Sequence, residues 1–391
     1  MPTEQLLEQF QSHLAQGNED FEVQSAFGKT RIVNHPGRAE QILQSEAYQR
    51  TSLLTMALGQ GLLASDGELW SKQRQKLSPH FGGQLLRDFE LHTLKALDSR
   101  LARWDQLAGS GQTWEAGEDL SRLTLDVAAG ALLSLEGPDL DPVSGAVTEV
   151  VTGLGKISAT IFAADLNLDP QYLQRLRDSI ATLDRFAYQL IERRTQQPLA
   201  GYDLLSRLLE GGDLPPVLVR DEIVTALISG HETTSQVVCW ALMLLCQHPD
   251  VYQLAQAEAR SQGADGRLPL IQAILHETMR LYPPVWYMGR RSGQETVVVS
   301  PWLIHRHPHH WERPLDFLPQ RFLDSAPSSR IYLPFGTGRH VCLGRRQALR
   351  EGSLILAALL GRYQMRPRND PRPQGHLTLR HWPPLEMELS L

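Results

Sequence analysis

Most hydrophobic positions of this chain recur three and four residues apart, which is the spacing of an amphipathic helix. The pattern predicts long helices over residues 85–107, 120–135, 172–194 and 217–246. Prolines stand directly before and shortly after the last of these runs, where they act as start and stop signals for a helix. A further amphipathic helix is expected near the N-terminus, around Leu6, Leu7 and Phe10.

Short alternating apolar runs predict a smaller β part. Residues 23–33 fit a hairpin, and residues 296–300 and 377–389 fit short strands. No internal repeat and no glycine- or proline-rich linker divides the chain. The sequence therefore predicts a mainly α fold with a minor β part, organised as a single domain over residues 1–391.

Composition narrows the class of protein. The 391 residues carry a formal net charge of −6 and a pI of about 6.2, which disfavours nucleic-acid binding. Three cysteines do not imply a disulfide scaffold. The polar N-terminus shows no signal-peptide pattern, and no window of about 18 apolar residues predicts a membrane span. We therefore expect a soluble, cytoplasmic protein.

The strongest chemical signal is a glycine-rich loop at residues 335–344, which reads FGTGRHVCLG. A lone cysteine in such a loop can offer its thiolate to a metal, because backbone N–H groups can approach and stabilise the charge. Gly336, Gly338 and Gly344 supply the backbone freedom for this approach. The alternative is a buried free cysteine in a glycine-rich turn.

This loop resembles the haem-ligand signature of the cytochrome P450 family, Phe-x-x-Gly-x-[His/Arg]-x-Cys-x-Gly. The resemblance implies the cytochrome P450 fold, with Cys342 as the thiolate ligand to the iron of haem b. Phe335 would pack beside the sulfur, and His340 would hydrogen-bond a haem propionate. Gly336 and Gly344 belong to the same cofactor-binding loop.

The longest predicted helix contains the run SGHETT at residues 229–234. It resembles the distal-helix motif of the same family, although Ser229 stands where alanine or glycine is usual. Thr233 would then hydrogen-bond dioxygen at the haem, and Glu232 would relay protons to it. Gly230 would let the helix open or approach a flat group. The alternative is that Thr233 merely bonds back to its own helix.

Two further segments indicate a buried ion network. Glu277 and Arg280 lie three residues apart on a predicted helix that ends before Pro283, so they can pair on one face. Residues 317–322 read FLPQRF and resemble a family segment whose arginine, here Arg321, joins that pair. We expect these three side chains to support the cysteine loop and to have no catalytic role.

Haem propionates need cationic or hydrogen-bonding partners. Trp70 and Arg74 lie one helical turn apart, and both can reach a carboxylate. The alternative interpretation is that Trp70 and Arg74 belong to an exposed basic helix in which the tryptophan is merely packed. Arg290 matches a propionate-binding arginine of the family, with the adjacent Arg291 as a substitute.

Other features receive no chemical role. Four histidines surround Pro308 in a pattern that fits no metal-ligand spacing, so we expect a solvated turn. Cys239 and Cys246 lie seven residues apart on the longest helix and are expected in the core. The segments 257–271 and 292–296 are shorter than is usual for the family, which leaves the local geometry open.

The resemblance implies a monooxygenase that hydroxylates a hydrophobic substrate of the lipid, carotenoid or terpenoid class. The substrate walls are expected from the segments 53–63, 161–162 and 285–288 and from Ala226. No flavin or iron–sulfur motif is present, so electrons would come from a separate ferredoxin- or flavodoxin-type reductase system. Such a carrier would dock on a basic patch, for which a plain charged surface is the alternative. The patch consists of Lys72, Arg74, Lys76, Arg345 and Arg346.

Two other functions remain open on the sequence. One is a peroxide-driven haem hydroxylase, against which the intact pair of Glu232 and Thr233 argues. The other is a haem-binding sensor or carrier without turnover, which would not need a proton relay.

Overall fold

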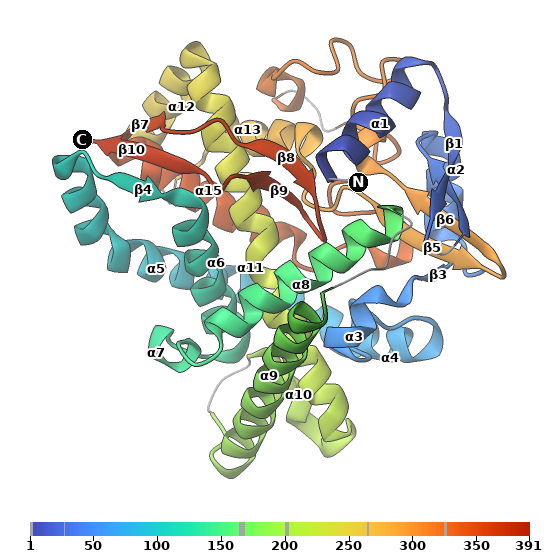
Figure 1. Cartoon of the computed structure of the whole chain (residues 1–391). Helices are drawn as coiled ribbons and strands as arrows, with labels where there is room; N and C mark the ends of the chain where they lie inside the picture. The colour runs from blue at the N-terminus through green and yellow to red at the C-terminus, as the bar shows by residue number, and fades with distance from the viewer. Residues whose placement is uncertain (1–2, 27, 164–168, 200–202, 264–265, 324–326) are drawn as a thin grey trace.

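Helix α11 (Pro216–Gln247) runs through the centre of the molecule, and the other helices lie around it (Figure 1). The computed structural model describes the chain except residues 1–2, 27, 164–168, 200–202, 264–265 and 324–326. The remaining α-helices are α1 (Thr3–Ala15), α2 (Pro36–Gln44), α3 (Thr55–Leu58), α4 (Gly67–Leu77), α5 (Gly83–Ser110), α6 (Ala116–Leu133), α7 (Gly137–Leu140), α8 (Ser144–Ala163), α9 (Pro170–Gln196), α10 (Leu204–Leu209), α12 (Pro249–Gln262), α13 (Pro269–Leu281), α14 (Pro301–Ile304) and α15 (Arg345–Arg362).

The strands of the described chain form small sheets beside the helices (Figure 1). They are β1 (Asp20–Ser25), β2 (Gly28–Val33), β3 (Gln49–Arg50), β4 (Thr113–Glu115), β5 (Met288–Ser292), β6 (Glu295–Val299), β7 (Gln364–Pro367), β8 (Arg372–Gly375), β9 (Leu379–Trp382) and β10 (Glu386–Ser390). The largest sheet has the order β1-β2-β6-β5-β3, with β2 parallel to β6 and the other pairs antiparallel. The smaller sheets are β4-β10-β7 and β8-β9.

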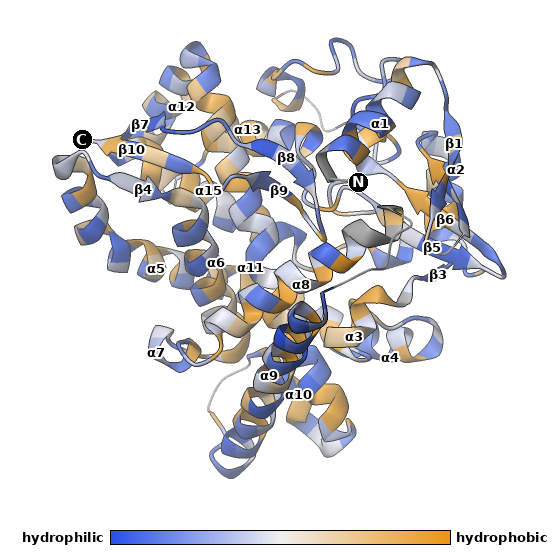
Figure 2. Ribbon diagram, in the orientation of Figure 1, coloured by the Kyte–Doolittle hydropathy of each residue, from blue (hydrophilic) through white to orange (hydrophobic). Residues whose placement is uncertain are grey.

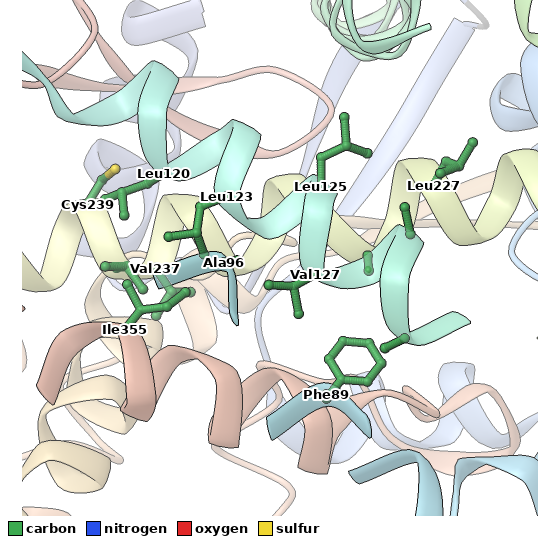
Figure 3. Close-up of a cluster of buried hydrophobic side chains, with 14 of the residues drawn as sticks. Phe89, Ala96, Leu120, Leu123, Leu125, Val127, Leu227, Val237, Cys239 and Ile355 are labelled. Atoms are coloured by element: carbon green, nitrogen blue, oxygen red, sulfur yellow. The ribbon is translucent and has the colours of Figure 1, made fainter. Parts of the chain in front are cut away.

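The main core forms where α5, α6, α11 and α15 pack their apolar faces together. Leu120 and Leu123 of α6 and Val237 and Cys239 of α11 belong to it, as does Ile355 of α15 (Figure 3). All five side chains are buried. By contrast, α9 carries hydrophilic residues along much of its length, as expected for a helix that packs with one side only (Figure 2). No helix among the described residues has the length and apolar character to cross a membrane.

Helices α6 and α11 approach each other closely at Gly230. A Cβ added there would lie 2.7 Å from the Cβ of Ala128, so any larger residue would push the two helices apart. One residue further on, the Thr124 hydroxyl of α6 donates to the carbonyl of His231 at 2.7 Å. The glycine in the middle of α11 therefore has a packing reason, which the sequence motif alone did not reveal.

The elements predicted from sequence are confirmed, with small shifts at their ends. The four long helices are α5, α6, α9 and α11, and the N-terminal amphipathic helix is α1. The predicted hairpin is β1–β2, and the predicted short strands are β6, β9 and β10. The short segment 292–296 closes the β5–β6 hairpin through a turn in which Gly293 has φ of +58°. The segment 257–271 comprises the end of α12, the connection 263–268 and the start of α13. Residues 264–265 of this connection lie outside the described residues.

The expectation of a solvated turn around Pro308 is wrong for two of its four histidines. His305 has no exposed surface and His307 is 5 % exposed. The Nε2 atom of His305 accepts a hydrogen bond from the Leu333 N–H at 2.8 Å. Burial, followed by the charge of nearby arginines, lowers the pKa of His305 to about 3, so the ring is neutral. No cluster of metal-ligating side chains occurs here or elsewhere in the described chain.

The ion network around Glu277 is confirmed. Glu277 and Arg280 of α13 have no exposed surface and form two hydrogen bonds of 2.7 and 2.8 Å. The Nε of Arg321 lies 3.4 Å from Glu277 Oε1, which also accepts from the Leu318 N–H at 2.9 Å. Arg280 also donates to the backbone carbonyls of His305, Pro314 and Asp316. This network ties α13 to the long segment that precedes the cysteine loop.

Candidate active site

The glycine-rich loop folds back on itself directly before α15. The Cys342 N–H donates to the carbonyl of Phe335 at 2.9 Å, which closes the loop. Gly336 and Gly338 both have φ of +70°, a left-handed conformation that favours glycine. Gly344 has φ of −81°, and a Cβ there would meet no protein atom within 4 Å. The protein backbone therefore requires glycine at the first two positions and does not require it at the third.

The side chain of Cys342 opens into a cavity of about 450 Å³. Burial raises the pKa of its thiol, while the Gly344 N–H and the charges of Arg74 and Arg345 act in the opposite direction. The first turn of α15 also lies next to the sulfur, and a helix N-terminus favours negative charge. These groups suit a thiolate, and a bound metal would hold the sulfur in that form.

The wall of this cavity is mainly hydrophobic. It includes side chains of α11, α15 and the segment 284–290 other than Trp286. Of the expected segment 53–63, only Leu53, Leu54, Leu62 and Leu63 line it. Ala226 lines it as expected from the sequence, as do Val285 and Tyr287. A cavity with this lining suits an apolar small molecule.

Two aromatic residues expected in the wall lie elsewhere. Trp286 and Phe162 pack against each other in a separate core, with ring centroids 5.8 Å apart, and neither lines the cavity. Trp286 is directed away because successive side chains of an extended segment point in opposite directions, and its neighbours Val285 and Tyr287 face the cavity. The side chain of Ile161 lies outside the described residues.

Several buried donors at one edge of the cavity have no hydrogen-bond partner in the described chain. They are Trp70 Nε1, Arg290 Nε and the ring nitrogen of His340 that carries the hydrogen, since neither nitrogen of this ring has a hydrogen-bond partner. The rings of Trp70 and His340 lie 4.4 Å apart, and burial together with the charge of Arg50 lowers the pKa of His340 to about 3. Because buried donors normally have partners, this edge is suited to the carboxylates of a ligand.

The other two arginines predicted for this role differ in position. Arg74 lines the cavity and donates from Nη1 to the Val341 carbonyl at 2.8 Å, within the cysteine loop. Arg291 is exposed and donates to the Gly293 carbonyl at 3.2 Å. The strand β5 therefore directs Arg290, and not its neighbour, toward the cavity.

A further arginine lies at this edge and was not predicted from the sequence. Arg50 donates from Nη1 to the carbonyls of Leu62 and Leu63 at 2.7 and 3.0 Å, and its N–H donates to Asp66 Oδ2 at 2.8 Å. Burial, followed by the charge of Arg290, lowers the pKa of Arg50 to about 10. No local motif marks Arg50, because its partners come from the fold. The cluster holds more arginines than acids, so the edge is positive.

The residues of the distal motif line the same cavity. Gly230, Glu232 and Thr233 all contribute to its wall from α11. The Thr233 hydroxyl donates to the Ser229 carbonyl at 3.4 Å, which is the back-bonded geometry of the alternative interpretation. The hydroxyl of Ser229 donates to the Thr225 carbonyl at a shorter 2.7 Å. The Thr233 bond is long and therefore weak, so this hydroxyl can turn toward a ligand in the cavity.

The carboxylate of Glu232 is held by an arginine from the far end of the chain. Arg380 of β9 pairs with Glu232 through Nε and donates from Nη1 to the Thr152 hydroxyl of α8 at 3.1 Å. Glu232 is 4 % exposed, so its charge has a partner where water has little access. The two residues are 148 positions apart, and no sequence signal connects them. Arg380 therefore sets the orientation of the acid.

Residues 21–390 match the family model described as Cytochrome P450. The chain belongs to the cytochrome P450 family. "Protein LUTEIN DEFICIENT 5, chloroplastic" from Arabidopsis thaliana is 28 % identical over 385 residues, which cover 85 % of this chain and 64 % of the plant protein. "Cyclooctatin synthase" from Streptomyces melanosporofaciens is 28 % identical over 401 residues, covering 88 % of this chain and 83 % of that protein. "Cytochrome P450 4F6" from Rattus norvegicus is 26 % identical over 438 residues, covering 95 % of this chain and 81 % of the rat protein.

Cytochromes P450 are haem-thiolate monooxygenases that act on small molecules with electrons from redox partners. The family therefore makes this chain an oxidoreductase with a haem-thiolate cofactor. The site fits that cofactor, because Cys342 faces a large cavity with unpartnered donors along one edge. Those donors, on Trp70, Arg290 and His340, are the chemistry that propionate carboxylates need.

The basic patch expected from sequence is smaller in the structure. Lys72 and Lys76 each pair with a carboxylate, at 2.8 and 2.6 Å, and Arg74 faces the cavity. Arg345 and Arg346 are exposed at the start of α15. The positive surface beside the cysteine loop therefore rests mainly on these two arginines.

Two further carboxyls line the cavity and were missed by the sequence analysis. Glu351 of α15 is 1 % exposed, and burial raises its pKa well above the usual value, with the Thr234 hydroxyl acting in the opposite direction. Glu222 of α11 is 2 % exposed, and each of its oxygens lies 3.1 Å from the Leu62 N–H that donates to it. Burial raises the pKa of Glu222 to about 7; the Leu62 N–H opposes this rise and the charge of Asp221 adds to it.

Glu222 is expected to make stability depend on pH. Its folded-state pKa of about 7 lies above its ordinary value of 4.5, so the folded chain holds this proton more tightly than the unfolded chain. The resulting stability is complete below pH 4.5, and about 3 kcal/mol is lost as the pH rises to 7. A Glu222→Gln chain keeps an acceptor for Leu62 and should not show this loss. Urea unfolding of both chains between pH 4.5 and 8 measures the difference; parallel curves would contradict the assignment.

Proposed function

We propose that this chain hydroxylates a hydrophobic small molecule of the lipid, carotenoid or terpenoid class. The observation that carries the proposal is one mainly apolar cavity that contains Cys342 together with Glu232 and Thr233. When bound, the haem-thiolate group supplies oxygen activation. One oxygen atom enters a C–H bond of the substrate, and the other leaves as water with two protons and two electrons.

The cofactor is proposed to be haem b, with Cys342 as its ligand and Phe335 beside the sulfur. The loop conformation at Gly336 and the start of α15 at Gly344 support this placement of the sulfur. The propionates would be held by the donors of Trp70, Arg74, Arg290 and His340. Arg50 adds positive charge to the same edge.

Proton delivery is proposed to use Thr233 and Glu232. Within the described chain, the Thr233 hydroxyl would have to break only its 3.4 Å hydrogen bond to the Ser229 carbonyl in order to donate to a ligand. Arg380 acts as a positioning residue for Glu232, and the Thr152 hydroxyl in turn orients Arg380. Gly230 keeps α11 close enough to α6 to leave this pair in the cavity wall.

Electrons are proposed to come from a separate ferredoxin- or flavodoxin-type system. Exposed Arg345 and Arg346 next to the cysteine loop are suited to an acidic partner, which charge would steer toward them. We also propose that the 391 residues form one domain, because α11 packs against elements from both halves of the chain, including α6 and α15.

The proposal is tested with the purified, haem-loaded chain. Oxygen uptake and hydroxylated product are measured for a panel of isoprenoids and fatty acids with a ferredoxin and its reductase. Product that depends on reductant supports the monooxygenase. Equal turnover with peroxide alone would instead indicate a peroxide-driven hydroxylase, and ligand binding without any consumption of reductant would indicate a carrier.

Thr233→Ala is expected to uncouple oxygen consumption from hydroxylation. Without its hydroxyl, proton delivery is less well directed, and product formed per reductant should fall about tenfold or more. Thr195→Ala is the matched control, because its hydroxyl makes the same type of back-bond, to the Ile191 carbonyl at 2.8 Å, on the surface of α9. If both variants gave the parent's product yield per electron, the relay would be wrong.

A further inference from the structure

The charged groups of the cavity wall are segregated by sign. In the described wall the arginines are Arg50, Arg74 and Arg290. These three lie at the edge that suits the propionates. The acidic groups of the described wall are Glu222, Glu232 and Glu351. A substrate carboxylate would therefore meet carboxyl groups in this wall, because its three arginines lie at the edge that suits the propionates. This arrangement opposes the burial of a substrate carboxylate.

Glu222 is the acid of this wall that lies near the start of α11, away from the cofactor end, and that forms no ion pair with an arginine in the described chain. The acid of the distal motif is already paired with an arginine, and Glu351 lies on α15 at the cofactor end of the cavity. Glu222 accepts from the Leu62 N–H, and the neighbouring Arg220 is engaged by Asp221 at 2.8 Å. A carboxyl has about four acceptor positions. Glu222 can therefore accept a second donor from a molecule inside the cavity.

The surroundings of Glu222 hold it in a fixed position. Two residues before Leu62, Gln60 donates its backbone N–H to the Asp221 carboxylate at 2.7 Å. Gly59 and Gly61 lie so close to α11 that a Cβ on either would fall 2.3 Å from Asp221 and 2.1 Å from the Thr225 hydroxyl, respectively. A recognition group that is already rigid loses little entropy when it binds a ligand.

The helix sets the distance between Glu222 and the proposed proton donor. Thr233 follows Glu222 by eleven residues on α11, which corresponds to about three turns and about 16 Å along the axis. Both residues therefore face the cavity. Glu222 is the first α11 residue that lines it, and Thr233 lies in the second half of the lining stretch, which continues to Val237. An extended farnesyl chain can span a distance of this order.

We propose, on the basis of the monooxygenase function above, that Glu222 is a specificity residue that receives the hydroxyl group of a neutral, elongated isoprenoid alcohol. The other end of the molecule would then lie beside Thr233. The hydroxyl would donate to Glu222, and the apolar chain would occupy the hydrophobic wall. A pKa of about 7 lets Glu222 be neutral or charged at little cost, and both forms can hydrogen-bond an alcohol. Buried ammonium groups carry a larger desolvation penalty, so an alcohol is favoured over an amine.

The ligand series that tests this inference is farnesol, farnesyl methyl ether, farnesoic acid and farnesylamine. Each is titrated into the ferric, haem-loaded chain, and the dissociation constant is read from the Soret shift. Farnesol should bind about tenfold or more tightly than the ether and the acid. Equal or tighter binding of the ether or the acid would overturn the proposal, and tighter binding of the amine would overturn the preference for an alcohol.

Variants separate recognition from support of the loop. Glu222→Leu should bring the ratio of ether to alcohol dissociation constants close to one, and Glu222→Gln should largely preserve it. Asp221→Asn is the matched control, because Asp221 anchors Gln60 in the same loop without lining the cavity. Its ratio should remain that of the parent. An equal collapse of the ratio in Asp221→Asn would show that Glu222 merely supports the loop.

Because the readout is a ratio of dissociation constants, it does not depend on turnover. If none of the four ligands stimulates reductant consumption, the monooxygenase function fails while the ratio still tests Glu222. If farnesol is hydroxylated but the ratio is one in the parent chain, the function stands and the role of Glu222 is wrong.

Discussion

A Cys342→Ser chain should keep haem but lose hydroxylation by about a thousandfold or more, which is the scale expected when a principal catalytic group is removed. Cys342 lines the cavity and is the proposed thiolate ligand, whereas serine at that position would supply a much weaker electron donor. The donors of Trp70, Arg74 and Arg290 are unchanged and should still hold the propionates. Haem content, the spectrum of the reduced carbon monoxide complex and turnover together measure the effect.

Cys246→Ser is the control for this substitution. Cys246 is half-buried on α11 and donates to the Met365 carbonyl at 3.4 Å, and burial raises its pKa to about 11. This thiol does not line the cavity, so the control should retain the parent's spectrum and turnover. Turnover of the Cys342→Ser chain within tenfold of the parent would disprove the ligand assignment.

Arg280→Ala should lower the free energy of unfolding by about 3–5 kcal/mol. The substitution leaves the Glu277 carboxylate with no exposed surface and without its strongest partner. It also removes the donor for three backbone carbonyls in the segment that precedes the cysteine loop. Urea unfolding of the haem-free and haem-loaded chains measures the loss.

Arg313→Ala provides the comparison. Arg313 and Asp316 have the same three-residue spacing as the buried pair and an N–O distance of 2.6 Å, but their side chains are 62 % and 45 % exposed. Exposed pairs contribute little, so this variant should lose no more than about 1 kcal/mol. Similar losses in the two variants would show that burial does not strengthen the Glu277 network.

The parts of the site that could be predicted from sequence are those whose residues are adjacent in the chain. The spacing of Phe335, His340 and Cys342 is set by one loop, and that of Glu232 and Thr233 by one helix. Local geometry fixes these relations before the chain packs. Helical periodicity likewise identified the long helices, because it reports which face of a segment becomes buried.

Periodicity does not report which segment lies opposite a given face. Arg380 reaches Glu232 only because β9 packs near α11, and Arg50 reaches the propionate edge through β3. The same limit explains why the sequence wrongly predicts Trp286 in the cavity wall. Its apolar character showed that it is buried, but the direction of its side chain depends on the pleat of an extended segment.

The wall segment between Gly59 and Leu63 has a consequence for protein engineering. Its backbone is fixed from both sides, by the carboxylates of α11 and by Arg50, and two of its positions have no room for a Cβ. The shape of this wall therefore resides in the backbone, while its chemistry resides in the side chains of Leu62 and Leu63. Libraries that vary those two leucines and leave both glycines intact can redirect substrate preference without rebuilding the scaffold.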